Sequence, residues 1–178
     1  MEQVVRIQEV GAYSERQYNR QDGSTEYFKS RGVVMKLTEH FTLEELTRTS
    51  VKGLANVPAP EHMENLKRLC RWLEMLRSEW NQRYGNGNDP IIINSGFRSE
   101  AVNKAVGGAT QSNHLTGCAV DIRACGLEQA LRYAVILLDI SQESQEAFDE
   151  LIIERKGYTV WVHFAVRPQG NRNKVMCY

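Results

Sequence analysis

The chain has 178 residues, and 22 lysine and arginine residues balance 22 aspartate and glutamate residues. This length fits one domain with a small addition, and the balanced charge argues against a protein that coats nucleic acid through clustered positive charge. No apolar run reaches the roughly 18 residues that cross a bilayer. The first ten residues, MEQVVRIQEV, lack the apolar core of a secretory signal. We therefore expect synthesis in the cytoplasm without a signal peptide, and no binding to membranes or nucleic acid.

The cysteines are scattered along the chain, and none belongs to a C-x-x-C pair, which disfavours a zinc ribbon or a thioredoxin-like redox site. A metal site would therefore draw on the few histidines, which are His40, His62, His114 and His163.

Residues 1–37 differ from the rest of the chain. Two strand-like stretches flank Asp22-Gly23, a turn signal, and this pattern predicts an N-terminal arm or β-hairpin of unknown role. The arm is rich in arginine and tyrosine, but its basic and acidic residues nearly cancel, which favours a solvated strand pair over a nucleic-acid site. The main domain is predicted over 38–178.

The rest of the chain predicts alternating helices and strands. Thr42-Leu43-Glu44-Glu45 has the pattern of a capping box at a helix start. Apolar residues spaced by three and four from Leu66 to Trp80 predict a long helix over 61–84. Further helices are expected over 99–106 and 127–138, and strands over 91–94, 118–124, 150–154 and 160–166. This order predicts an α+β domain in which helices pack on a small, mainly antiparallel sheet.

Two of these strands carry polar residues on one face. Alternation places Asp121 opposite the apolar side of its strand, and His163 likewise, while His114 lies in the loop before Asp121. Two imidazoles and one carboxylate form a good ligand set for Zn²⁺, with a fourth position left for water. On spacing alone, structural roles for the three residues remain the more common interpretation.

The residues around them are more specific. Ser112-x-His114-x-x-Gly117-x-Ala119-x-Asp121, followed by Trp161-Val162-His163, resembles the zinc D-alanyl-D-alanine peptidase family, as does the upstream Ser95-Gly96-Phe97-Arg98-Ser99. The resemblance covers about residues 39–167 and implies the fold shared by D,D-peptidases and the hedgehog signalling domain. It implies that His114, Asp121 and His163 bind Zn²⁺, that Arg98 holds the substrate's terminal carboxylate, and that Ser112 contacts the substrate or orients its neighbour.

The general base departs from the family pattern. Members carry a carboxylate about three residues before the last histidine, where this chain has Val160. If the strands over 150–154 and 160–166 form a hairpin, Glu154 lies beside the strand that carries His163, and Glu154 is the predicted base. Glu150 and Asp149 are the alternatives, and a solvated glutamate at a strand end is an equal interpretation of Glu154.

The resemblance implies zinc-dependent hydrolysis of a peptide bond involving D-alanine in peptidoglycan, either as a carboxypeptidase or as an endopeptidase. The implied partner is the peptidoglycan stem peptide, and we expect a monomer. Without a signal peptide, the protein would reach the wall through release or export, as a phage or prophage lysis enzyme does. The alternative is a non-catalytic zinc module that binds cell-wall peptide or a protein partner.

Overall fold

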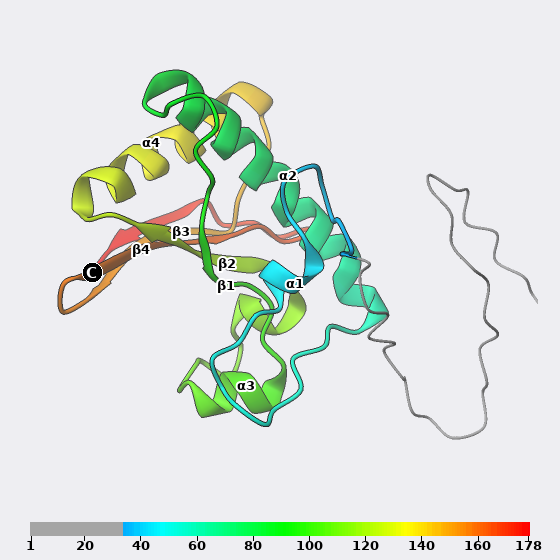
Figure 1. The fold of residues 1–178 in the computed structure, drawn as a ribbon. Helices are drawn as coiled ribbons and strands as arrows, with labels where there is room; N and C mark the ends of the chain where they lie inside the picture. Colours follow the sequence, from blue (N-terminus) through cyan, green and yellow to red (C-terminus); the bar gives the residue numbers. More distant parts are fainter. Residues whose placement is uncertain (1–33) are drawn as a thin grey trace, which may run out of the picture. The chain divides into compact units, whose positions relative to one another are not determined.

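The computed structural model describes residues 34–178. The predicted arm over 1–37 lies, except for its last few residues, outside this part and stays a prediction. In chain order the described elements are α1 (Leu43–Leu46), α2 (Pro60–Arg83), β1 (Ile93–Ser95), α3 (Glu100–Ala105), the 3₁₀ turn η1 (Asn113–Thr116), β2 (Ala119–Ala124), α4 (Leu127–Ser144), β3 (Glu150–Lys156), β4 (Thr159–Ala165) and β5 (Lys174–Cys177). Figure 1 shows these elements around one sheet.

The sheet has five strands in the order β1-β2-β4-β3-β5. The predicted hairpin is present, because β3 and β4 pair antiparallel from Glu150↔Ala165 to Lys156↔Thr159. The expectation of a mainly antiparallel sheet is corrected: the sheet is mixed, since β5 runs parallel to β3. The chain after β4 turns back around the sheet edge, and the backbone N–H of Lys174 donates to the carbonyl of Asp149 at 3.0 Å, which starts this pairing.

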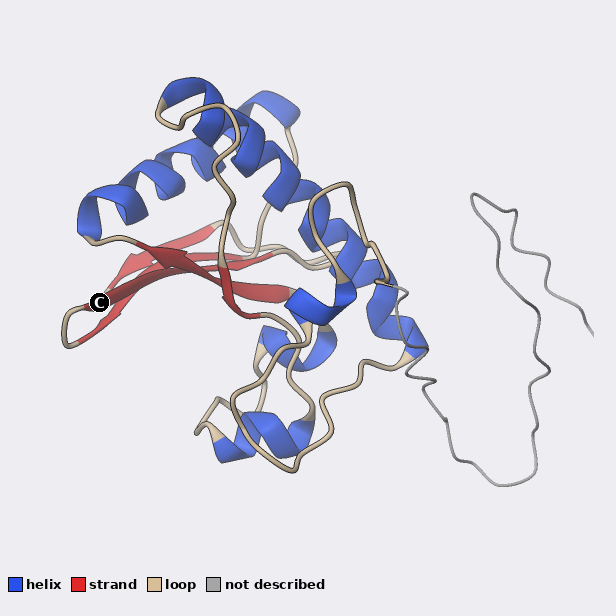
Figure 2. Cartoon of the chain, in the orientation of Figure 1, coloured by secondary structure: helices blue, strands red, loops and turns tan. Residues whose placement is uncertain are grey.

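The two long helices cover one face of the sheet (Figure 2). Apolar residues of β2 and β4 on this face pack against α2 and α4, and Trp72 of α2 meets Phe164 of β4 with ring centroids 5.1 Å apart. Among the described helices, none combines the length and apolar character that a bilayer crossing needs. Within residues 34–178 no long helix covers the opposite face, and α3 and η1 lie on that side (Figure 1).

Candidate metal centre

Three predicted ligands meet on the face of the sheet opposite the long helices. Asp121 of β2 and His163 of β4 are direct cross-strand partners, and η1 brings His114 beside them. One ligand atom from each of these residues lies within 4.8 Å of the others. All three are well shielded: the side chain of His114 is 3% exposed, and those of Asp121 and His163 are each 12% exposed.

The two imidazoles are oriented by contacts on their far sides. Nδ1 of His114 lies 2.6 Å from the carbonyl oxygen of Gly96, so its Nε2 faces Oδ1 of Asp121 at 3.3 Å. His163 has the opposite orientation, with Nδ1 2.9 Å from the same oxygen and Nε2 3.6 Å from Oε2 of Glu150. Such outer contacts fix the ring orientation of metal-binding histidines. The two nitrogens and one oxygen that converge here are the donor types that Zn²⁺ prefers, so the residues fit this metal.

Gly96 can hold His114 because it lies directly against the end of α1. A Cβ atom at this position would come 2.4 Å from the carbonyl oxygen of Leu46, closer than any side chain allows. The same carbonyl accepts the backbone N–H of Phe97 at 2.7 Å. The capping box of Thr42 and Glu45, present as predicted, fixes the start of this helix. Residue 96 must therefore be a glycine. Only without a side chain can its backbone pack against the end of α1 and place the carbonyl that orients His114.

The loop that carries His114 explains the pattern Ser-x-His-x-x-Gly. The hydroxyl of Ser112 accepts the backbone N–H of His114 at 3.3 Å and thereby caps η1. Gly117 ends the turn with φ 71, a left-handed conformation that favours glycine. A side chain there would also press on Leu66 of α2. Ser112 therefore positions the backbone of its neighbour His114.

Arg98 lies within this cluster. Its Nη2 donates to Oδ2 of Asp121 at 2.5 Å, and its Nε donates to Oγ of Ser95 at 2.8 Å. Burial raises the pKa of Asp121, but hydrogen bonds from His114 and His163 outweigh it and hold this pKa well below its usual range. The carboxylate of Asp121 is therefore ionised, as a metal ligand must be.

Comparison with known proteins decides the family. A family model described as Peptidase M15 matches residues 39–163. The chain belongs to the M15 peptidase family. A curated relative, the zinc D-Ala-D-Ala carboxypeptidase of Streptomyces albus G, is 46% identical over 55 residues, which is 28% of this chain. The match covers only 22% of that relative's length. These findings confirm the resemblance to the D-alanyl-D-alanine peptidase family.

Glu154 of the M15 domain lies on the same face as His163. The β3–β4 register pairs Glu154 with Trp161, and Oε2 of Glu154 accepts the indole N–H of Trp161 at 2.6 Å. Burial would lower the pKa of His163, but Asp121 raises it through a hydrogen bond and its charge, and the charges of Glu154 and Glu150 raise it further. Glu154 therefore lies on the same face of the sheet as the predicted ligands, two residues along β3 from Ile152, the cross-strand partner of His163.

The two alternative acids lie in an ion-pair network that sequence reasoning missed. Asp149 is fully buried and accepts two hydrogen bonds from Arg172, both at 2.8 Å, and one from Asn113 at 2.7 Å. Burial raises the pKa of Asp149, but these bonds and the nearby arginines outweigh it and lower the pKa. Glu150 also pairs with Arg172, at 2.9 Å. Asn113 lies inside the recognised motif and could have been noticed, whereas no local pattern singled out Arg172.

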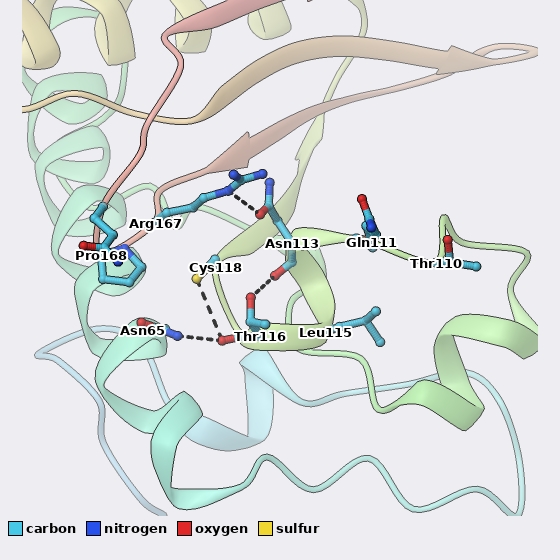
Figure 3. A pocket seen from close by; sticks show the side chains of 11 residues that line it. Asn65, Thr110, Gln111, Asn113, Leu115, Thr116, Cys118, Arg167 and Pro168 are labelled. Atoms are coloured by element: carbon cyan, nitrogen blue, oxygen red, sulfur yellow. Dashed lines mark hydrogen bonds between the residues drawn. The ribbon is translucent and has the colours of Figure 1, made fainter.

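Two cavities lie beside segments that carry neighbours of the predicted ligands. The larger, of about 570 Å³, lies beside η1 and is lined by residues that include Ser112, Asn113, Arg167 and Asn65. Figure 3 shows Arg167 reaching toward Asn113, whose Oδ1 accepts from its Nε at 2.9 Å. The smaller, of about 140 Å³, is lined by Ser95 and Arg98, and the two cavities share no lining residue.

Proposed function

We propose that this M15 domain is a zinc peptidase that hydrolyses a peptide bond involving D-alanine in peptidoglycan. The observation that carries this proposal is the shielded cluster of His114, Asp121 and His163 in a chain of this family. The curated relative is named for zinc and for D-Ala-D-Ala, which supports the same substrate class. Action at the cell wall after release or export, as in phage lysis, stays a prediction.

The metal ligands proposed are Nε2 of His114, a carboxylate oxygen of Asp121 and Nδ1 of His163. When bound, Zn²⁺ supplies polarisation of the scissile carbonyl and lowers the pKa of a coordinated water to about 7. The residues around the ligands keep them oriented: the Gly96 carbonyl holds His114, and Arg98 holds the second oxygen of Asp121. The shielding of all three side chains strengthens each electrostatic interaction inside the site.

Glu154 is the proposed general base. Trp161 is the one side chain that hydrogen-bonds its carboxylate among residues 34–178, so the charge of Glu154 is not neutralised by a cation. Asp149 and Glu150, in contrast, are each paired with arginine. A carboxylate on the ligand face of the sheet, without a cationic partner among residues 34–178, can accept a proton from the attacking water and pass it to the leaving amine.

Arg98 and Ser112 complete the proposed substrate site. Arg98 uses Nε and Nη2 in contacts with Ser95 and Asp121, which leaves Nη1 as the group that can reach a substrate oxygen. Ser112 lines the larger cavity while its hydroxyl caps η1. We therefore expect Arg98 to serve both the ligand Asp121 and the substrate, and Ser112 to act mainly by fixing His114.

The test uses zinc-loaded protein and a peptide that ends in D-Ala-D-Ala. Glu154→Gln should lower kcat by about 10²- to 10⁴-fold and keep its zinc, because it removes proton transfer and leaves the ligands in place. Glu150→Gln is the matched variant; it keeps a side-chain oxygen for the contact with Nε2 of His163, so kcat should fall much less than in Glu154→Gln. The reverse result would assign the base to Glu150. Zinc binding without hydrolysis by the wild type would favour the non-catalytic module that binds cell-wall peptide or a protein partner.

A further inference from the structure

The smaller cavity has the composition of a carboxylate site. It lies between the segment after α1, the end of β1 and α3, and Arg98 connects it to the proposed metal ligand Asp121. Two arginines and no acidic residue line it, together with polar and valine side chains. The lining residues are Arg48, Thr49, Ser50, Asn56, Asn94, Ser95, Arg98, Val102 and Val106.

The two arginines differ in their hydrogen bonding. The guanidinium of Arg98 already has partners, because it donates to the Asp121 carboxylate at 2.5 Å and to the Ser95 hydroxyl at 2.8 Å. Its positive charge is balanced by Asp121. Arg48 is exposed, and its guanidinium forms no ion pair or hydrogen bond with any residue in 34–178. The free positive charge of the cavity is therefore that of Arg48.

The backbone around Arg48 is anchored even though its side chain is free. Nδ2 of Asn56 donates to the carbonyl of Thr47 at 2.7 Å and to that of Phe97 at 2.8 Å. Oδ1 of Asn56 accepts the backbone N–H of Ser99 at 2.7 Å. One amide side chain thus ties the segment that carries Arg48 to the segment that carries Arg98. The two guanidiniums line the same cavity because of this connection.

From these contacts we infer that Arg48 binds the terminal carboxylate of the residue released by hydrolysis, so that the enzyme acts as a carboxypeptidase. This inference rests on the proposed function. The guanidinium fork matches a carboxylate, and the side chains of Val102 and Val106 offer an apolar wall for the methyl group of alanine. A peptide that continued through the cavity would place a neutral amide beside Arg48, whose charge no acidic residue of the cavity lining balances.

The experiment compares two substrates that differ in one group: an acetylated peptide ending in D-Ala-D-Ala with a free carboxylate, and the same peptide with a C-terminal amide. Arg48→Ala should raise KM for the free acid by about 10- to 100-fold, with kcat nearly unchanged, because a charge-assisted bond is lost. It should leave the amide's kinetics and the zinc content unchanged. Arg48→Lys should recover part of the affinity, since it keeps the charge without the fork.

Lys52→Ala is the matched control, because it removes an exposed cation nearby that does not line the cavity. An equal effect of Lys52→Ala and Arg48→Ala would overturn the inference in favour of a general effect of charge. No change on Arg48→Ala, with both substrates cleaved equally by the wild type, would overturn it and leave the hydrolase proposal intact.

A binding measurement separates the inference from the proposed function. Calorimetric titration of the metal-free protein with the free-acid peptide should show binding that Arg48→Ala weakens about tenfold. Binding through Arg48 without hydrolysis by the zinc-loaded wild type would keep the inference about the carboxylate and overturn the hydrolase. Neither binding nor hydrolysis would overturn both.

Discussion

The two faces of β2 and β4 are built from alternating residues of the same short strands, yet they obey different requirements. On one face Val120, Ile122, Val162 and Phe164 are buried against the long helices. On the other, Asp121 and His163 point toward η1 and form, with His114, the proposed metal site. The first face needs only apolar side chains at every second residue, whereas the second also needs groups delivered by distant segments. A slip of one residue in the register would exchange the two faces.

Removing a ligand should have the largest effect, and it should fall on the site face alone. His163→Ala is expected to abolish stoichiometric zinc binding and to lower hydrolysis by at least about a thousandfold, equivalent to about 4 kcal/mol. The unfolding free energy of the chelated protein should change by no more than about 1 kcal/mol. Elemental analysis, peptide hydrolysis and urea unfolding measure the three quantities. Retention of one zinc per chain would remove His163 from the ligand set.

Phe164→Ala tests the core face one residue along the same strand. The ring is fully buried and contacts those of Trp72 and Phe148, with centroids 5.1 and 5.8 Å away. We expect a loss of about 3 to 5 kcal/mol in unfolding free energy, because truncation leaves a cavity. Val135→Ala, on the exposed side of α4, is the control and should change stability by less than about 0.5 kcal/mol. A small effect of Phe164→Ala would mean that the core can collapse around the cavity.

Gly96→Ala tests the link between the faces and should have the smallest effect. The added methyl group would collide with the Leu46 carbonyl, so we expect a loss of about 1 to 3 kcal/mol in stability. Displacement of the Gly96 carbonyl from His114 should also weaken zinc affinity about tenfold. Gly170→Ala, which places its methyl group in open space, is the control for backbone strain and should leave zinc affinity unchanged. Equal zinc affinities for the two variants would show that the carbonyl does not orient the ligand.

Local periodicity was enough to predict most of the fold. The apolar stripe predicted a helix over 61–84, and α2 spans Pro60–Arg83. The strands that carry Asp121 and His163 were also predicted, because their apolar residues alternate. β5 was missed, since its four residues are too few to show a period and its partner β3 is distant in sequence. That missing strand is why the sheet was expected to be mainly antiparallel.

The candidate site was predictable only where its residues belong to a recognisable sequence motif. The motifs around His114, Asp121 and His163 resemble those of a known family, and the structure brings these residues together. The contacts that orient these residues were not predictable. Every residue has a backbone carbonyl, so the sequence does not indicate that the carbonyl of Gly96 contacts His114. Arg48 was missed for a similar reason: an isolated arginine after a short helix has no distinguishing pattern until the cavity it lines is known.

The contact between the Gly96 carbonyl and His114 has a consequence for how the proposed site would take up a metal ion. The imidazole ring of His114 is already oriented by the Gly96 carbonyl, which is positioned by packing against the end of α1. For a metal ion to bind, Asp121 would only have to replace its contacts with the two imidazoles by a bond to the ion. The backbone would not have to move. Such a preformed receptor favours reversible loading, so that stripping by a chelator and replenishment by a substitute such as cobalt should both leave the polypeptide intact.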